Sequence, residues 1–205
     1  IVYKKNSSKF DVLVRLPSKK RLMIKNIIIP LLGLHNIKNS TAAIAVTFII
    51  GISIKTIKSG LSQFKGVQRR FNKLFKYRGI EFFDDYAHHP SEIKEVLSGV
   101  KEVYKNEKII CIFQPHRISR LKDLKEDFSK SFKNADEVVL CPLYTAGEKI
   151  KLGFKYDDFA KEISKNSRVN LFLVKNEKNL AKYVKKNVYG KKIVIGMGAG
   201  SISTW

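Results

Sequence analysis

The sequence predicts an α/β fold with a largely parallel sheet. From residue 80 onward, short apolar runs alternate with stretches that repeat apolar residues at helical spacing, a pattern typical of βαβ units. Most of these runs are followed by a loop rich in ionisable, aromatic or glycine residues, and ligands of open α/β sheets bind at the carboxyl ends of the strands. We expect strands at 80–84, 108–113, 137–142, 169–174 and 192–197, and helices at 90–104, 119–133, 156–165 and 177–187.

The N-terminal residues show a different pattern, which predicts a β-hairpin. Apolar residues alternate with polar ones from Phe10 to Leu16, and a second apolar run covers 22–29. Between them, Pro17-Ser18-Lys19-Lys20 is typical of a turn. We expect this hairpin to form the edge of a sheet whose other strands are missing.

Two helices are expected between the hairpin and the main sheet. Helical patterns cover 40–50 and about 53–64, and Asn36 or Asn39 could cap the first by accepting a backbone N–H. Gly66 is a natural residue for the end of the second helix. We therefore expect a domain boundary near this glycine.

The composition is strongly basic. Lys and Arg number 40 against 18 Asp and Glu, for a formal net charge of +22. A basic surface can bind nucleic acid or acidic lipid, so a stand-alone module that binds nucleic acid or protein is one functional alternative. However, the lysines are spread over every expected helix, and the richness in Lys, Ile and Asn is the bias of an AT-rich gene. Nucleic acid is therefore not the expected partner.

Neither membrane insertion nor secretion is expected. The longest apolar window, 42–54, is shorter than the roughly 20 residues that span a bilayer, and polar residues stand where a secretory signal would have its apolar core. Cys111 and Cys141 lie inside apolar runs without metal-ligand spacing, which predicts buried thiols in a reducing cytoplasm. The chain also lacks an initiator Met, as a piece of a longer protein would.

The loop after the first strand of the main sheet is the densest in ionisable groups. Two carboxylates, a tyrosine and two histidines lie between Phe83 and Pro90. Proline suits the first turn of a helix, where its missing N–H costs nothing. The alternative to a ligand site is a polar loop with an Asp cap and solvated imidazoles.

The next loop places two arginines where cations are disfavoured. Arg117 and Arg120 lie three residues apart at the start of an expected helix, close to the positive end of its dipole. A bound carboxylate or phosphate would offset this cost, and arginine forks suit such anions. The alternative is two solvated arginines.

The last loop contains Gly-x-Gly-x-Gly over 196–200, which is a weak dinucleotide signal. Ser201 replaces the third spaced glycine, and no helix is expected before Trp205. The distribution of histidine is more informative, because core packing would not place every one of them in these loops. The histidines are His35, His88, His89 and His116.

Taken in order, these loops resemble those of the Mur ligase family, and the resemblance covers nearly the whole chain. It rests on Gly33-Leu34-His35-Asn36 with Asn39, Gly66 with Arg69-Arg70-Phe71, the run from Asp84 to Pro90, Gln114-Pro115-His116-Arg117 with Ser119-Arg120, Tyr144 with Ala146-Gly147-Glu148, and Gly198-Ala199-Gly200. Two positions depart from the family, which more often has Tyr at Ile118 and Asp at Ser201.

The resemblance implies ATP-dependent ligation of L-alanine to UDP-N-acetylmuramate in peptidoglycan precursor synthesis, through an acyl phosphate. The element from Gln114 to Arg117 favours L-alanine, although a sister ligase with another amino acid is an alternative. The family fold has an N-terminal UDP-sugar domain, a central ATPase domain and a C-terminal Rossmann-like domain. Residues 1–66 would be the tail of the central domain, and 67–205 the C-terminal domain.

The resemblance also implies roles for particular residues. His35, Asn36 and Asn39 would lie against the adenine of ATP, Arg70 would reach ATP, and Asp85 would hold the ribose hydroxyls. The substrate-binding residues would be Tyr86, His88, His116, Arg117 and Arg120, of which His88, Arg117 and Arg120 would be catalytic.

The chain contains no G-x-x-x-x-G-K-[ST] loop, whose amides and lysine cradle transferred phosphates. We therefore expect these residues to be inactive alone and to work with the missing N-terminal domains of the same enzyme. The ligands of the catalytic Mg²⁺ would lie mostly in those domains, and no metal site is expected in this chain.

Overall fold

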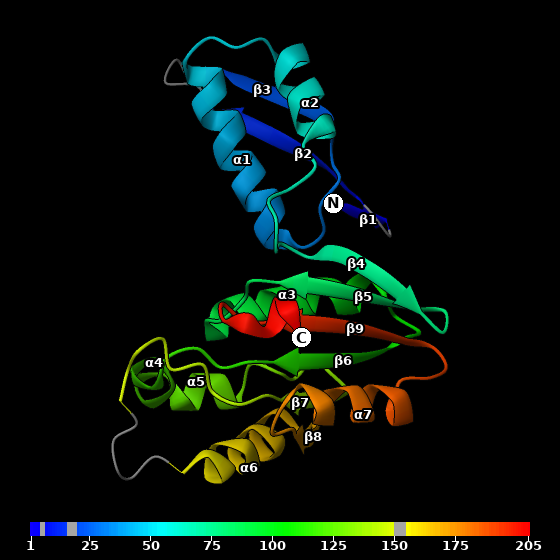
Figure 1. Cartoon of the computed structure of the whole chain (residues 1–205). Helices are drawn as coiled ribbons and strands as arrows, with labels where there is room; N and C mark the ends of the chain where they lie inside the picture. Colours follow the sequence, from blue (N-terminus) through cyan, green and yellow to red (C-terminus); the bar gives the residue numbers. More distant parts are fainter. Residues whose placement is uncertain (5–6, 16–19, 150–154) are drawn as a thin grey trace. The chain divides into compact units, whose positions relative to one another are not determined.

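A computed structural model describes residues 1–4, 7–15, 20–149 and 155–205. The chain divides into two compact units, Ile1–Val67 and Gln68–Trp205, which are coloured along the sequence in Figure 1. Most of the turn expected over 17–20 lies outside the described residues. In the described part, no helix is both long and apolar enough to cross a membrane.

The first unit packs two helices on an antiparallel sheet. Within its described residues the strands are β1 (Val2–Lys4), β2 (Ser7–Arg15) and β3 (Arg21–Ile29), in the order β1-β2-β3. The helices are α1 (Leu34–Ile49) and α2 (Ile54–Gln63). Strands β2 and β3 confirm the expected hairpin, and β1 is an additional strand. The core joins Phe10 and Ile27 of the sheet to Ile44 and Ile57 of the helices.

Helix α1 begins six residues earlier than expected, so the capping hypothesis for Asn36 and Asn39 is wrong. The N-cap residue is Gly33, which adopts a φ of +89° and offers no side-chain cap. Inside the first turn, Asn36 Nδ2 donates to the Leu32 carbonyl over 2.7 Å. The low helix propensity of His and Asn hides this turn from a sequence pattern, whereas Ile37 is buried and holds it in place.

The second unit is a six-stranded sheet covered by helices on both faces, which confirms the predicted α/β fold. In the part of the chain that the structure describes, the strand order is β4-β5-β9-β6-β7-β8. The strands are β4 (Asn72–Tyr77), β5 (Ile80–Asp85), β6 (Lys108–Phe113), β7 (Glu137–Leu140), β8 (Asn170–Leu173) and β9 (Lys192–Met197). The helices are α3 (Pro90–Val103), α4 (Ile118–Asp123), α5 (Lys125–Ser129), α6 (Tyr156–Ser167), α7 (Glu177–Asn187) and the 3₁₀ helix η1 (Ser201–Thr204).

Strand β9 comes last in the sequence but pairs in parallel with both β5 and β6. The connection from β8 through α7 must therefore pass back across β7 and β6. Right-handed crossovers place such a returning helix on the face opposite to the outgoing helices. Figure 1 accordingly shows α3 and α7 on opposite faces of the sheet.

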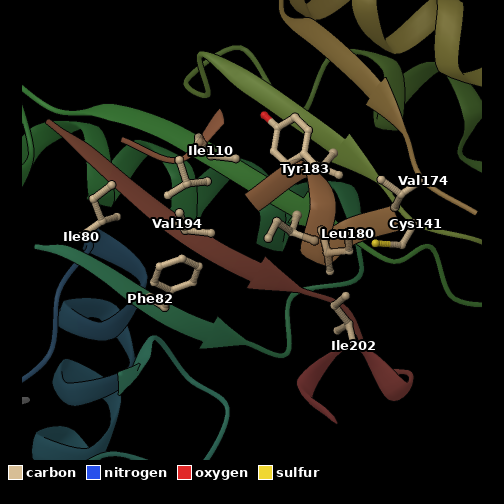
Figure 2. Close-up of a cluster of buried hydrophobic side chains, with 12 residues drawn as sticks. Ile80, Phe82, Ile110, Cys141, Val174, Leu180, Tyr183, Val194 and Ile202 are labelled. Carbon is tan, nitrogen blue, oxygen red and sulfur yellow. The ribbon is translucent and has the colours of Figure 1, made fainter. Parts of the chain in front are cut away.

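Figure 2 shows the core on the α7 face of the sheet. Phe82, Ile110 and Val194, from three neighbouring strands, meet Leu180 and Tyr183 of α7 in one cluster. Because side chains alternate along a strand, Phe83 points to the other face, where its ring contacts Tyr104 at the end of α3 at a centroid distance of 6.3 Å. The central strands are thus buried on both sides, as their apolar sequences require.

The helices of the second unit differ from expectation in two places, and β4 was not expected at all. The helix expected over 119–133 is broken at Leu124 into α4 and α5, and Ser167 of α6 then stabilises the following turn by accepting from Phe132 N over 3.1 Å. The segment before Trp205, expected to lack a helix, forms the short η1. Gln114 favours this turn by accepting from Ile202 N over 2.9 Å.

Candidate functional site

Four loops meet at the carboxyl edge of the sheet because their strands are adjacent and end in register. Asp85 pairs with Met197, and Phe113 pairs with the same Met197 from the other side. The ladder continues beyond the strands, with Gly198 N donating to Asp85 O over 3.2 Å and Gln114 N to Met197 O over 2.9 Å. The loops after β5, β9, β6 and β7 therefore form one surface, as expected for an open α/β sheet.

The Asp85 carboxylate is buried beneath this surface, with 2% of the residue exposed. One oxygen accepts from Phe71 N over 2.8 Å and the other from Ala87 N over 2.7 Å. Burial raises the pKa of Asp85 from 3.8 to about 6, although the two N–H groups and the nearby Arg70 oppose the shift. In this geometry Asp85 holds the loop together, and its role toward a ribose stays a prediction.

The raised pKa of Asp85 predicts a pH dependence of stability. Between the unfolded value of 3.8 and the folded value of about 6, the folded state binds more protons, so the free energy of unfolding should fall as pH rises, by about 2 kcal/mol from pH 4 to pH 6. Asp85→Asn, which mimics the neutral acid, should lack this component. Urea unfolding at pH 4 and pH 6, followed by the fluorescence of the single Trp205, measures it. An equal pH slope in both proteins would contradict the prediction.

Glu92 organises the turn that leads into α3 and contains both histidines of this loop. Its Oε2 accepts from His88 N over 3.0 Å and from His89 N over 3.2 Å, and His89 caps the helix from the other side by accepting from Ser91 N. Burial opposes ionisation of Glu92, but these N–H groups outweigh it and lower its pKa. The turn therefore fixes His88 at the edge of the surface.

An aromatic row crosses three of the loops. The ring of Tyr86 meets His88 edge-on at 5.1 Å, His88 meets His116 edge-on at 5.8 Å, and His116 stacks on Tyr144 at 5.4 Å with an interplanar angle of 12°. The structure thus brings together Tyr86, His88 and His116, three of the predicted substrate-binding residues. Tyr144, which the sequence placed only in the family pattern, is the fourth ring of the row.

Arg120 lies against His116. Its Nη1 is 3.3 Å from His116 Nδ1 and donates to the His116 carbonyl over 3.2 Å. Partial burial lowers the pKa of His116, and the charges of Arg120, His88 and Arg117 lower it further. A neutral imidazole is therefore favoured at this position, and Arg120 has part of its donor capacity in use.

Arg117 is the exposed arginine of the same loop. Its backbone has a φ of +68°, which is unfavourable for a residue with a Cβ, and its N–H donates to Tyr144 O over 2.9 Å. Among the described residues its side chain has no hydrogen-bond or ion-pair partner, and it is exposed. Arg117 is thus an exposed arginine in the loop after β6, and its role toward an anion stays a prediction.

Gly198 and Gly200 allow the loop after β9 to lie directly on Gln114. A Cβ at Gly198 would lie 2.6 Å from the Gln114 carbonyl oxygen, and one at Gly200 would lie 2.5 Å from Gln114 Oε1 and 2.8 Å from Cγ of Tyr144. The glycine-rich segment therefore serves close backbone packing beneath the aromatic row.

Arg69 and Asp84 lie beside this loop and were not predicted as site residues. Arg69 Nε donates to Asp84 Oδ2 over 3.1 Å, and Arg69 Nη2 donates to the Gly198 carbonyl over 2.5 Å. The sequence drew attention to Arg69 only within a family pattern. Its hydrogen-bond partners lie far from it in the sequence, and such contacts leave no periodic signal. Arg70, which was predicted, is half-exposed and approaches Glu92 at 3.9 Å.

The three predicted adenine residues belong to the first unit. His35, Asn36 and Asn39 lie in the first two turns of α1, and Gly33 accommodates the His35 ring, since a Cβ there would lie 2.8 Å from His35 Cε1. Asn39 is exposed. These positions stay predictions.

The second unit matches a known domain. The model of the "Mur ligase, glutamate ligase domain" fits residues 69–200, which include every loop of the site. The chain belongs to the Mur ligase family.

Relatives in the Mur ligase family extend the similarity over both units. A UDP-N-acetylmuramate–L-alanine ligase of Pelagibacter ubique is 65% identical over 205 residues, which are 100% of this chain and 44% of the relative. One from Bartonella tribocorum is 42% identical over 197 residues, 96% of this chain and 41% of the relative. The chain therefore spans less than half the length of these relatives.

Solved structures of Mur ligases share the fold. The crystal structure of a UDP-N-acetylmuramate–alanine ligase from Thermotoga maritima superposes with a TM-score of 0.75 at 30% identity, covering 98% of this chain and 41% of the other. A murein peptide ligase from Psychrobacter arcticus, at 21% identity and a TM-score of 0.65, shares the fold.

Mur ligases use ATP, and the family resemblance implies a Mg²⁺ ion beside it, with ligands mostly outside this chain. In the part of the chain that the structure describes, no three His, Cys, Asp or Glu side chains are grouped so that they could hold a metal ion. The site's carboxylates are instead engaged by N–H groups and by Arg69. These residues do not fit a metal ion.

Proposed function

We propose that this chain is the C-terminal portion of an ATP-dependent ligase that joins L-alanine to UDP-N-acetylmuramate. The observation that carries the proposal is the 65% identity to such a ligase over the whole chain, because that alignment includes all four loops of the site. The exposed Arg117 fork beside the row of histidines and tyrosines supports it, since the reaction has anionic reactants.

The reaction has two chemical steps. The muramate carboxylate attacks the γ-phosphorus of ATP, which forms an acyl phosphate and releases ADP. The amine of L-alanine, having lost its extra proton, then attacks the acyl carbon, and phosphate departs with the electrons of the C–O bond. A cation near the acyl phosphate stabilises the charge that develops as phosphate leaves.

In this proposal the residues of the surface bind and orient the reactants. Arg117 pairs with the L-alanine carboxylate or the acyl phosphate, and Arg120 supports it while holding His116. Tyr86 and His88 line the position of the attacking amine, with His88 near enough to accept its proton. Orientation of this kind converts a bimolecular step into an effectively unimolecular one.

The candidates for binding ATP in the longer protein are those that the family resemblance implies. Arg70 has an exposed guanidinium suited to phosphate, and Asp85 remains the candidate for the ribose hydroxyls. His35, Asn36 and Asn39 remain the candidates for the adenine. Buried, unpaired Cys111 and Cys141 support a reducing cytoplasm as the location.

A chimera tests the proposal. Residues 1–205 of this chain would replace the matched portion of the Pelagibacter ubique ligase, whose remaining part supplies what this chain lacks. We expect the chimera to release phosphate only when ATP, UDP-N-acetylmuramate and L-alanine are all present, and the 205-residue chain alone to release none. Glycine and L-serine as replacements for L-alanine test the sister-ligase alternative.

An inactive but folded chimera would count against the proposal. The alternative, a basic binding module, would then be supported by binding of the chain to a DNA duplex with an affinity that falls steeply as salt rises.

A further inference from the structure

We propose that Arg69 and Asp84 form a positioning pair that fixes the Tyr86 ring and the loop at Gly198 in the geometry that the substrates require. Neither residue has a role in the ligation described above, and neither needs to touch a substrate. The kinetic part of this inference rests on the proposed ligase function, whereas its structural part can be measured without any activity.

Arg69 connects three separate segments through one side chain and one carbonyl. Its guanidinium donates to Asp84 at the end of β5 over 3.1 Å and to the Gly198 carbonyl after β9 over 2.5 Å. The same guanidinium lies over the Tyr86 ring, 4.9 Å from its centroid, and the Arg69 carbonyl accepts from Tyr86 N over 2.6 Å. Only a planar fork can make these contacts together, so lysine is not an equivalent residue.

Arg69 is the ion-pair partner of the buried Asp84. Asp84 is 4% exposed, and its Oδ1 is buried without a hydrogen-bond partner among the described residues. Neighbouring Asp85 is equally buried but accepts two backbone N–H groups. A buried ion pair of this kind adds little net stability compared with apolar side chains. The ion pair is better explained by its geometry, because it holds the groups that Arg69 contacts in one arrangement.

The contacts of Arg69 reach both ends of the aromatic row. Tyr86, at one end, is 37% exposed, and its ring is held by Arg69 on a face and by His88 at an edge. At the other end, Tyr144 packs against Gly200, two residues beyond the carbonyl that Arg69 holds. Loss of the pair should therefore release the ring of Tyr86 and loosen the support of Tyr144.

The test uses the double variant Arg69→Met with Asp84→Asn, because removal of both charges avoids a buried, unpaired carboxylate. In the chimera we expect kcat to fall and the KM for L-alanine to rise, with kcat/KM lowered by about 10- to 100-fold. Arg69→Lys should lose most of the same activity although its charge is kept. The melting temperature of the double variant should change by only a few degrees.

Glu137→Gln is the matched control. Glu137 and Lys192 form a similarly buried pair at 3.2 Å in the same sheet, with side-chain exposures of 14% and 12%, but at the amino ends of the strands. Loss of the Glu137–Lys192 pair should alter the melting temperature without changing kcat or KM. If the double variant keeps both constants within about twofold of the parent, or if the control loses as much activity, the proposal is wrong.

Fluorine NMR of the 205-residue chain, with fluorotyrosine incorporated at position 86, tests the structural part. We expect one narrow resonance in the parent and in Glu137→Gln, and a shifted, broadened one in the double variant. An unchanged resonance in the double variant would overturn the proposal, whatever the kinetics. An inactive parent chimera would refute the ligase function alone and leave this spectrum to decide.

Discussion

Arg117→Ala is expected to lower kcat/KM of the chimera by about 100- to 1,000-fold, the range seen when a charge-stabilising donor is removed from an active site. The Arg117 side chain has no partner among the described residues, so its loss should not disturb the fold. Its effect should therefore appear in turnover and in the KM for L-alanine, and not in the melting temperature. Steady-state phosphate release measures both constants.

Arg168→Ala is the matched control for this change. Arg168 also has a positive φ, of +57°, and an exposed side chain, but it lies at the end of α6. The two variants lose the same charge from an exposed position with positive φ. Equal activity losses in both would show that Arg117 acts only through the overall charge of the protein, against the proposed role.

Gly198→Ala is expected to destabilise the second unit by about 3 kcal/mol, from steric overlap together with backbone strain. The added Cβ would lie 2.6 Å from the Gln114 carbonyl oxygen, at a φ of +146°. The nearest atom belongs to the backbone, so it is not the end of a flexible side chain that could move away. Urea unfolding followed by the fluorescence of Trp205, which packs against the core of this unit, reports the loss.

Gly190→Ala is the control that introduces backbone strain without steric overlap. Gly190 has a φ of +76° and nothing within 4 Å of an added Cβ, so alanine there should cost only about 1 kcal/mol. If both variants lose the same stability, the close approach to Gln114 is not what requires glycine at position 198.

The sequence allowed the parallel sheet to be predicted because its strands are apolar runs separated by helical patterns. Strand β4 escaped prediction because it is held by pairing and not by burial: Leu74 and Phe75 are each 53% exposed. The sequence nevertheless contained a signal, because a glycine such as Gly79 is typical of a two-residue hairpin turn. In the structure, Arg78 and Gly79 both have positive φ and join Tyr77 to Ile80.

The site residues that carry charge or aromatic rings could be named from the loops, but their partners could not. Nothing in the sequence around Arg69 indicates that its fork reaches Gly198, 129 positions away. The break at Leu124 and the start of α1 are similar cases, because tertiary contacts decide both. Sequence patterns report burial along one element, whereas a site depends on which elements become neighbours.

The position of β9 between β5 and β6 also has a consequence for how this protein is made. Strand β5 pairs with β9 across more than a hundred residues, as Phe82 does with Val194, so loop closure makes assembly of the sheet slow. On the ribosome, β5 and β6 would leave the exit tunnel with their facing edges unpaired until residues 192–197 have been translated. Newly made chains would thus expose two apolar strand edges, which makes them clients for chaperones during synthesis.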